Sequence, residues 1–220
     1  MIVFQNATED DLRQILEKSL SRSIEEGEYF FFQGDPAEYL YVLIEGQVKL
    51  LQNNPRGQQV NLRTIYPWQM FGALGAVREE ADYPASAMAL ENSTALAIKA
   101  VFLKSLMKTR PYLSFDLMHL MTDYIQEMQV RYRELATERV EQRIARALLR
   151  LVAQSGQQTE AGIELSFSRQ DVAEMSGTTL YTVSRVMTEW ERHSLVRLGR
   201  EKIEITNPHG LVKIAEGMEK

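Results

Sequence analysis

A cluster of polar side chains in the last quarter of this 220-residue chain has the chemistry of nucleic-acid recognition. Arg185 can donate two hydrogen bonds to guanine O6 and N7, the commonest specific contact in the DNA major groove. Tyr181 can hydrogen-bond through its hydroxyl or pack on a thymine methyl. Short hydroxyls and a second guanidinium suit phosphate oxygens, which fix the register of a protein on DNA. The candidate DNA-binding residues are therefore Arg169, Thr179, Tyr181, Thr182, Ser184 and Arg185.

Two short helices joined by a tight turn would position these side chains. Ser168 can cap the first helix, and Asp171 completes a capping box. A turn with a glycine at residues 176–178 precedes a second helix. The apolar side of that helix is predicted to contain Leu180, Val183, Val186, Met187 and Trp190. Residues 195–206 form two β runs around a Gly-Arg-Glu turn, which predicts a winged helix-turn-helix. The alternative is a packed helical hairpin without a nucleic-acid partner.

A long helix with two apolar stripes is predicted over residues 111–137, with Pro111 in its first turn. One stripe repeats at spacings of four and three, and the other, at 118, 125 and 132, repeats every seven residues. Two stripes can serve packing on the helix's own domain and on a second copy of the chain. The predicted dimer interface is Leu117, Met121, Tyr124, Met128 and Leu135. The alternative is a single long helix buried by one chain.

The next helix, predicted over residues 138–154, has arginines on one face at spacings of four, three and four. That face either contacts phosphates or is a solvated surface beside Glu138 and Glu141. The arginines are Arg139, Arg143, Arg146 and Arg150.

The N-terminal half has the pattern of an antiparallel β domain. A short amphipathic helix over Asp10 to Leu20 precedes closely spaced apolar runs between residues 23 and 98. Turn residues at 53–57 predict a hairpin loop. Strands this close, with no helices between them, indicate a sandwich, roll or barrel.

Composition excludes several classes of function. The chain has no cysteine, which rules out disulfides, thiolate zinc sites, iron–sulfur clusters and a cysteine nucleophile. Residues 1–110 contain no histidine, so a cupin-like metal enzyme is not expected, and the sequence contains no P-loop or nucleophile motif. The acidic start and the short longest apolar run, 39–44, argue against a signal peptide and a membrane span. A soluble, cytoplasmic protein is expected, not an enzyme.

The whole chain resembles the Crp/Fnr family of bacterial transcription regulators. The motifs that carry this resemblance are Phe32-Gln33-Gly34-Asp35, Leu43-Ile44-Glu45-Gly46-Gln47-Val48, Phe71-Gly72-Ala73-Leu74-Gly75, Arg143-Ile144-Ala145-Arg146-Ala147-Leu148-Leu149, Phe167-Ser168-Arg169-Gln170-Asp171-Val172-Ala173 and Gly177-Thr178-Thr179-Leu180-Tyr181-Thr182-Val183-Ser184-Arg185. The resemblance implies an α+β chain with a β-roll sensor (1–110), a dimerisation helix (111–137) and a winged helix-turn-helix (138–220). It implies a homodimer on palindromic double-stranded DNA, a hinge near residues 136–138, and contact with RNA polymerase if the protein is an activator.

Departures from the family pattern bear on the signal. Where cyclic-AMP-binding members carry Glu, Arg and Ser, this chain has Ala73, Tyr83 and Pro84, and the adenine-contacting pair aligns near Met128 and Gln129. A buried phosphate with no local cation is disfavoured, so cyclic AMP is not expected. The candidate effector pocket is Gly72, Ala73, Leu74, Tyr83, Pro84, Ala85, Met128 and Gln129.

Two further features concern the DNA half-site and the branch of the family that this chain resembles. Tyr181 replaces a Glu that would accept a hydrogen bond from cytosine N4, so the DNA half-site is expected to differ at that base pair. Residues 83–87 and 179–185 look most like the nitric-oxide-responsive branch, which is thought to use haem, and His119 is the candidate axial ligand. A regulator with no effector, one that binds a small organic acid, and a protein-binding module without DNA are the alternatives.

Overall fold

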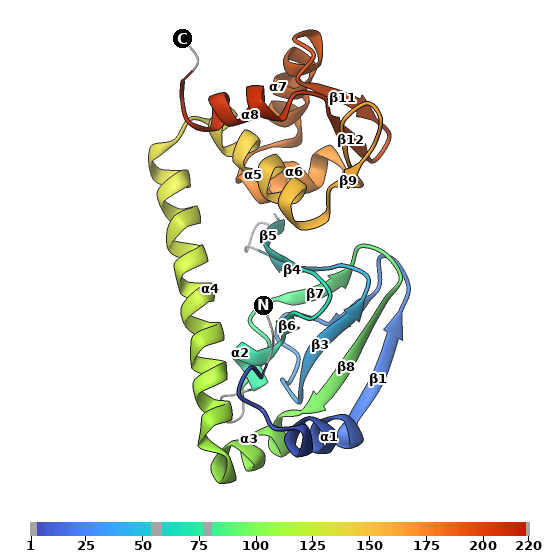
Figure 1. Cartoon of the computed structure of the whole chain (residues 1–220), viewed down its shortest axis with the longest axis vertical. Helices are drawn as coiled ribbons and strands as arrows, with labels where there is room; N and C mark the ends of the chain where they lie inside the picture. Colours follow the sequence, from blue (N-terminus) through green and yellow to red (C-terminus); the bar gives the residue numbers. More distant parts are fainter. Residues whose placement is uncertain (1–3, 54–58, 77–80, 219–220) are drawn as a thin grey trace. The chain divides into compact units, whose positions relative to one another are not determined.

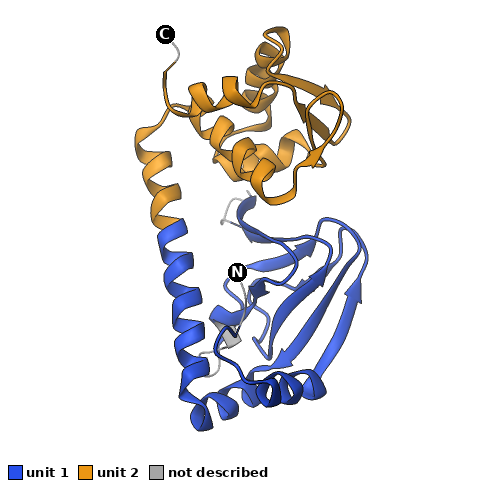
Figure 2. Ribbon diagram, in the orientation of Figure 1, with its two compact units in different colours: residues 1–127 blue, residues 128–220 orange. Residues whose placement is uncertain are grey.

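The computed structural model describes residues 4–53, 59–76 and 81–218. The chain divides into two compact units, residues 1–127 and 128–220 (Figure 2). Antiparallel sheets and long helices make up the first unit and a helix-turn-helix with a small sheet the second (Figure 1). The predicted α+β fold class is confirmed.

Within the described residues, the first unit contains two four-stranded antiparallel sheets. One sheet has the strand order β1-β8-β3-β6 and the other has β2-β7-β4-β5. The strands are β1 (Ser19–Ile24), β2 (Tyr29–Phe31), β3 (Tyr39–Glu45), β4 (Val48–Asn53), β5 (Gln59–Ile65), β6 (Met70–Phe71), β7 (Ser86–Ala89) and β8 (Ser93–Lys99). β4 and β5 pair as a hairpin from Asn53 and Gln59 onward, whereas loop residues 54–58 lie outside the described residues.

α1 (Glu9–Lys18) and α4 (Pro111–Thr137) begin and end close to the predicted positions. α2 (Ala73–Ala76) and α3 (Ala100–Thr109) were not predicted, and α2 lies between β6 and β7, where no helix was expected. α1 ends before the predicted Leu20 because Ser19 and Leu20 pair with β8 as the start of β1. Across the part of the chain that the structure describes, no helix combines the length and the apolar character needed to cross a membrane.

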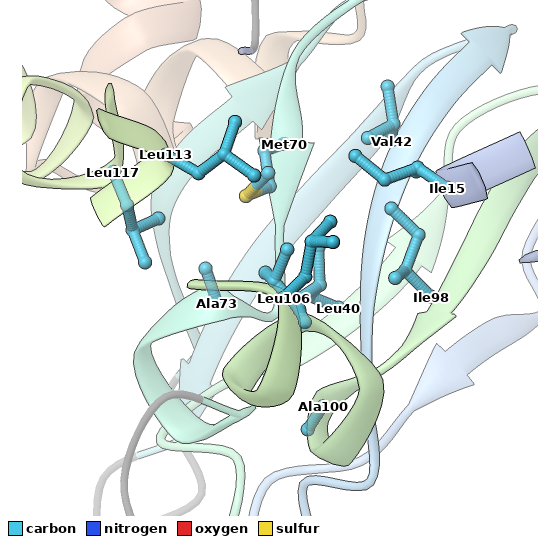
Figure 3. Close-up of a cluster of buried hydrophobic side chains, with 11 residues drawn as sticks. Ile15, Leu40, Val42, Met70, Ala73, Ile98, Ala100, Leu106, Leu113 and Leu117 are labelled. Carbon is cyan, nitrogen blue, oxygen red and sulfur yellow. The ribbon is translucent and has the colours of Figure 1, made fainter. Parts of the chain in front are cut away.

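Two hydrophobic clusters hold the roll together. The first joins one sheet to the helices, and Leu113 and Leu117 of α4 belong to it together with Met70 of β6 (Figure 3). The second is rich in aromatic side chains, namely Phe30, Phe31, Tyr41, Phe71 and Tyr83. Leu117 is only 8% exposed in this single chain, so its assignment to the dimer interface is wrong. It belongs to the core because α4 faces the roll at this turn.

α1 is attached to the start of α4 through one buried carboxylate. Asp11 accepts a hydrogen bond of 2.6 Å from the Tyr112 hydroxyl and pairs with Arg110. Burial raises the pKa of Asp11, but hydrogen bonds from Tyr112 and Thr8 and the charge of Arg110 outweigh it and lower the pKa to about 2. The carboxylate is therefore ionised at neutral pH.

The second unit contains the predicted winged helix-turn-helix. Its elements are α5 (Val140–Ser155), β9 (Gln157–Gln158), β10 (Ile163–Leu165), α6 (Arg169–Ser176), α7 (Leu180–Arg192), β11 (Val196–Gly199), β12 (Lys202–Ile205) and α8 (Pro208–Ala215). The antiparallel sheet has the order β11-β12-β10-β9, and β11 and β12 form the wing. Val183, Val186, Met187 and Trp190 are buried as predicted, but Leu180 is 46% exposed because it is the first residue of α7.

Arginines of α5 contact the end of α4, the residue that follows it and the end of α6. Arg150 pairs with Glu134 at 2.8 Å, and Arg146 pairs with Glu138 at 2.9 Å. Arg143 donates to the Ser176 carbonyl oxygen at 3.0 Å. These three side chains therefore neither form a solvated face nor extend toward phosphates. They also explain why the boundary between the units lies within α4, before the predicted hinge at residues 136–138.

Candidate nucleic-acid interface and ligand cavity

The helix-turn-helix is built from local signals that the sequence contains. Ser168 caps α6 in a reciprocal capping box with Asp171, and the Ser168 Oγ accepts from the Asp171 N–H at 3.1 Å. Gly177 ends α6 in the left-handed conformation, with φ of 62°. Thr179 then caps α7 by accepting from the Thr182 N–H at 3.2 Å. The N-terminal turn of α7 thus has a fixed position and a partial positive charge.

All six predicted DNA-binding residues lie at the helix-turn-helix. Thr179, Tyr181 and Arg185 are exposed, and Tyr181 is 79% exposed. Arg169, Thr182 and Ser184 are half-buried. The Arg185 guanidinium lies 4.0 Å from the Glu141 carboxylate, an exposed pair. Such a pair contributes about 0–1 kcal/mol, so Arg185 can exchange it for a base edge or a phosphate.

The wing adds a cation that the sequence analysis did not single out. Arg200 is exposed in the turn between β11 and β12. The strands beside it place Arg197 2.7 Å from Glu204 and Lys202 against Glu164. The two strand cations are held by carboxylates, whereas the turn places Arg200 at the tip of the wing. Arg200 could have been identified from the sequence by its position within the predicted hairpin turn.

A cavity in the first unit gathers most of the predicted effector residues. It holds about 620 Å³ of empty space, including the part that opens to solvent. The predicted residues that line it are Gly72, Ala73, Leu74, Tyr83, Pro84 and Ala85. Met128 and Gln129 do not line it: both are exposed residues of the second unit, so their assignment to the pocket is wrong.

Tyr83 forms a fixed wall of this cavity. Its hydroxyl donates to the Tyr39 carbonyl at 2.6 Å and accepts from the Tyr39 N–H at 3.1 Å. Its ring stacks on Phe31 with centroids 3.7 Å apart. Burial raises the pKa of Tyr83, so the hydroxyl stays protonated. Gly72 has φ of 76°, and a Cβ there would lie 3.2 Å from the Tyr83 ring, which explains the glycine.

Arg63 of β5 supplies the cavity with a cation, so the expectation of no local cation is wrong. A β-bulge explains its position. The register of β4 and β5 shifts between Leu50 and Leu51, which pair with Arg63 and Asn61, and this leaves Leu62 as the extra residue. Adjacent residues of a regular strand point to opposite faces. The bulge instead lets both Leu62 and Arg63 line the cavity.

The residues of the predicted dimer seam on α4 fall into two groups, one that lines the roll cavity and one that is exposed. Met121 and Tyr124 line the cavity of their own chain, so that part of the seam is not an outward face. Met128 and Leu135 are exposed, and for these two the assignment stays a prediction. The exposed apolar residues on that side of α4 are Met118, Ile125, Met128, Tyr132 and Leu135.

The candidate haem ligand does not fit the cavity. His119 is exposed on α4 and is not one of the residues that line the cavity. The Tyr83 hydroxyl, which does face this region, is already engaged by the Tyr39 backbone. The described residues therefore offer no histidine to a haem bound there.

Together, a β-roll with a cavity and a winged helix-turn-helix define the architecture of a DNA-binding regulator. The known families agree with this class. Residues 21–110 match the cyclic nucleotide-binding domain, and residues 142–214 match the Crp-like helix-turn-helix domain.

Relatives match both units in one chain. The chain is 29% identical over 193 residues to the cyclic AMP receptor protein of Thermus thermophilus, covering 88% of this chain and 87% of that one. It is 28% identical over 214 residues to the transcriptional activator protein Anr of Pseudomonas aeruginosa, covering 94% and 84%. A crystal structure of a CRP-family regulator from Thermus thermophilus shares the fold, with a TM-score of 0.77, 21% identity and coverage of 89% and 96%. The protein belongs to the Crp/Fnr family of DNA-binding transcription regulators, which are not enzymes.

Proposed function

We propose that this regulator binds a palindromic DNA site as a homodimer and that a small molecule in the roll cavity controls its affinity. The observation that carries the proposal is the exposed N-terminal half of α7, with Tyr181 and Arg185 opposite a buried apolar side. With this half of α7 in the major groove, Arg185 donates to guanine O6 and N7. The hydroxyls of Thr179, Thr182 and Ser184 contact phosphates. The protein acts in the cytoplasm, where the DNA is, and contacts RNA polymerase if it activates.

The DNA contact is tested by replacing Arg185 with Ala. Specific affinity should fall by about 1–3 kcal/mol, and selectivity at one base pair should relax, as measured by fluorescence anisotropy on variant half-sites. Arg192→Ala is the matched control, because Arg192 is an exposed arginine at the far end of the same helix. Unchanged base preference in Arg185→Ala would refute its role as the reading residue.

The homodimer is supported by the exposed apolar side of α4. Its residues Met118, Ile125, Met128, Tyr132 and Leu135 are spaced seven, three, four and three apart, as in a coiled-coil seam. The double variant Ile125→Lys, Tyr132→Lys should sediment as a monomer. Val130→Lys, an exposed apolar position on another side of α4, should leave the dimer intact. A double variant that remains dimeric contradicts this interface.

The position of His119 supports an effector other than histidine-ligated haem. Protein purified from haem-replete, low-oxygen cells should show no stoichiometric Soret band. A Soret band lost in His119→Ala would reverse this part of the proposal.

The cavity also does not favour cyclic AMP, because Ala73, Tyr83 and Pro84 provide no group for the ribose and no guanidinium at the family's phosphate position. The proposed control is a shift in population between states of weak and strong DNA binding.

A further inference from the structure

The part of the chain that binds DNA, a polyanion, has no excess of positive charge. Residues 138–220, which include the helix-turn-helix and the wing, contain 12 Lys and Arg and 12 Asp and Glu. Contacts between cations and phosphates supply the affinity of a regulator for DNA of any sequence. A unit whose charges balance gains little from such contacts. The positions of its carboxylates therefore bear on how it separates its own site from other DNA.

In the wing, carboxylates take up the donors of the cations. Arg197 donates to the Glu204 carboxylate at 2.7 Å, and Lys202 pairs with Glu164. A distance of 2.7 Å is that of a charge-assisted hydrogen bond, so the donor concerned is engaged within the sheet. These carboxylates reduce both the charge and the hydrogen-bonding capacity that the wing strands offer to DNA.

The carboxylate beside Arg185 acts differently, because it lies near the guanidinium without bonding to it. Glu141, in the first turn of α5, has its Oε1 4.0 Å from the Arg185 Nη2. This is longer than the about 2.7–2.9 Å of a charge-assisted hydrogen bond. Glu141 therefore offsets the charge of Arg185 and leaves its N–H donors available. Glu189, one turn further along α7, pairs instead with Arg192 at 3.2 Å.

This arrangement affects the two kinds of DNA contact unequally. A phosphate carries a full negative charge, so its attraction to Arg185 depends on the net charge around the guanidinium. Guanine O6 and N7 are uncharged acceptors, so a bidentate contact depends mainly on two free donors in the right geometry. A carboxylate 4.0 Å from the guanidinium repels the phosphate and leaves the donors in place. Glu141 thus weakens a phosphate contact of Arg185 more than a guanine contact.

We propose that Glu141 is a specificity-determining residue, whose carboxylate prevents Arg185 from strengthening the binding of DNA of any sequence. The proposal rests on the proposed role of Arg185 as the reading residue. On a sequence without the right guanine, Arg185 can only turn to a phosphate, and Glu141 weakens that contact. The loss falls on complexes with the wrong sequence. Glu141 thereby raises the ratio of specific to non-specific affinity, once in each protomer of the proposed homodimer.

The test compares full-length Glu141→Gln with the natural chain on two duplexes. One is a site that the natural chain selects from randomised half-sites, and the other is a scrambled duplex of the same base composition. Fluorescence anisotropy at several salt concentrations gives both affinities. Glu141→Gln should bind the scrambled duplex ~3–10-fold more tightly, with a salt slope steeper by about 1 per protomer. Affinity for the selected site should change by less than ~3-fold, so the ratio of the two affinities should fall.

Two variants separate this effect from a general change in charge. Glu189→Gln removes the same charge from an exposed carboxylate that pairs with Arg192 at the far end of α7, and it should keep the natural ratio. Glu141→Asp keeps the charge in the first turn of α5 and should retain most of the ratio. An equal fall of the ratio in Glu189→Gln would overturn the proposal, because any carboxylate of this unit would then serve.

The coupling to Arg185 gives the decisive control. Because Glu141 acts through Arg185, the double variant Arg185→Ala, Glu141→Gln should bind the scrambled duplex as Arg185→Ala does. Tighter binding by the double variant would show that the carboxylate repels phosphates by itself, which overturns the proposal. An unchanged ratio in Glu141→Gln also overturns it and leaves the reading role of Arg185 intact. Unchanged base preference in Arg185→Ala is a separate result, since it refutes the reading role itself.

Discussion

The DNA-facing surface and the roll cavity are built in opposite ways. The surface comes from residues 169–192, which follow one another in the sequence. The cavity takes its walls from segments of β2, β4, β5 and β6, from residues 72–74 and 83–85, and from α4. A short segment positions its side chains through caps and turns, whereas the cavity depends on the register of strands far apart in sequence. Function in this chain thus combines a local site with a non-local one.

The two regions also differ in how strongly water screens their charged side chains. Arg185 is exposed beside an exposed Glu141 at 4.0 Å, so water screens the pair and its release costs little. Arg63 is largely buried, and its pairing with a carboxylate is stronger in that less polar environment. Loss of the carboxylate beside Arg63 should therefore cost the protein more than loss of the carboxylate beside Arg185.

The largest expected effect tests whether the cavity wall belongs to the first unit alone. Phe31→Ala removes a buried ring that stacks on Tyr83, and it should destabilise the roll by about 3–5 kcal/mol. Hydrogen–deuterium exchange should show lost protection in β7, which pairs with β2, while α7 stays protected. Phe32→Ala, the exposed neighbour, should cost much less. Loss of protection in α7 as well would break the division into independent regions.

A buried ion pair tests the second unit in the same way. Arg150→Met leaves the Glu134 carboxylate buried without its partner, which should cost about 3 kcal/mol. Trp190 is the buried tryptophan of this unit, so urea unfolding can be followed by its fluorescence in a Trp68→Phe background. The further change Glu134→Leu should recover most of the loss. A single variant as stable as its parent would mean that the pair does not hold α4 to α5.

What the sequence predicted, and what it did not, follows from the same contrast. The capping residue Ser168, the turn at Gly177 and the exposure of Tyr181 could all be predicted because each depends on neighbours within a few residues. Arg63 could not, because its direction depends on a bulge opposite β4. Leu117 was misplaced because an apolar heptad does not say which stripe faces the roll.

A substitution at the reading surface should change specificity without changing the cavity. Tyr181→Glu introduces an acceptor for cytosine N4, so preference at one base pair should shift by about 1–3 kcal/mol toward cytosine. Selection from a library of randomised half-sites measures this shift. Thr188→Glu adds the same charge at an exposed position about two turns further along α7, so it controls for repulsion from phosphates. Identical selected sites for both variants would exclude Tyr181 from base contact.

The smallest expected effect comes from the helix capping box, a local motif that occurs in both units. Thr8 and Asp11 form a capping box at α1, and Ser168 and Asp171 form one at α6. Ser168→Ala should cost the second unit about 1 kcal/mol, seen as a lower urea midpoint of Trp190 fluorescence.

Thr8→Ala should cost the first unit more than a cap alone is worth. Its partner Asp11 is buried and also bonded to Tyr112 and Arg110, so loss of the hydroxyl that donates at 2.8 Å leaves that carboxylate less satisfied. Hydrogen exchange of α1 amides measures the loss in the first unit. Equal losses in the two variants would show that a cap has the same value in both regions. A larger loss for Thr8→Ala would show that the surrounding packing sets the value of a local signal.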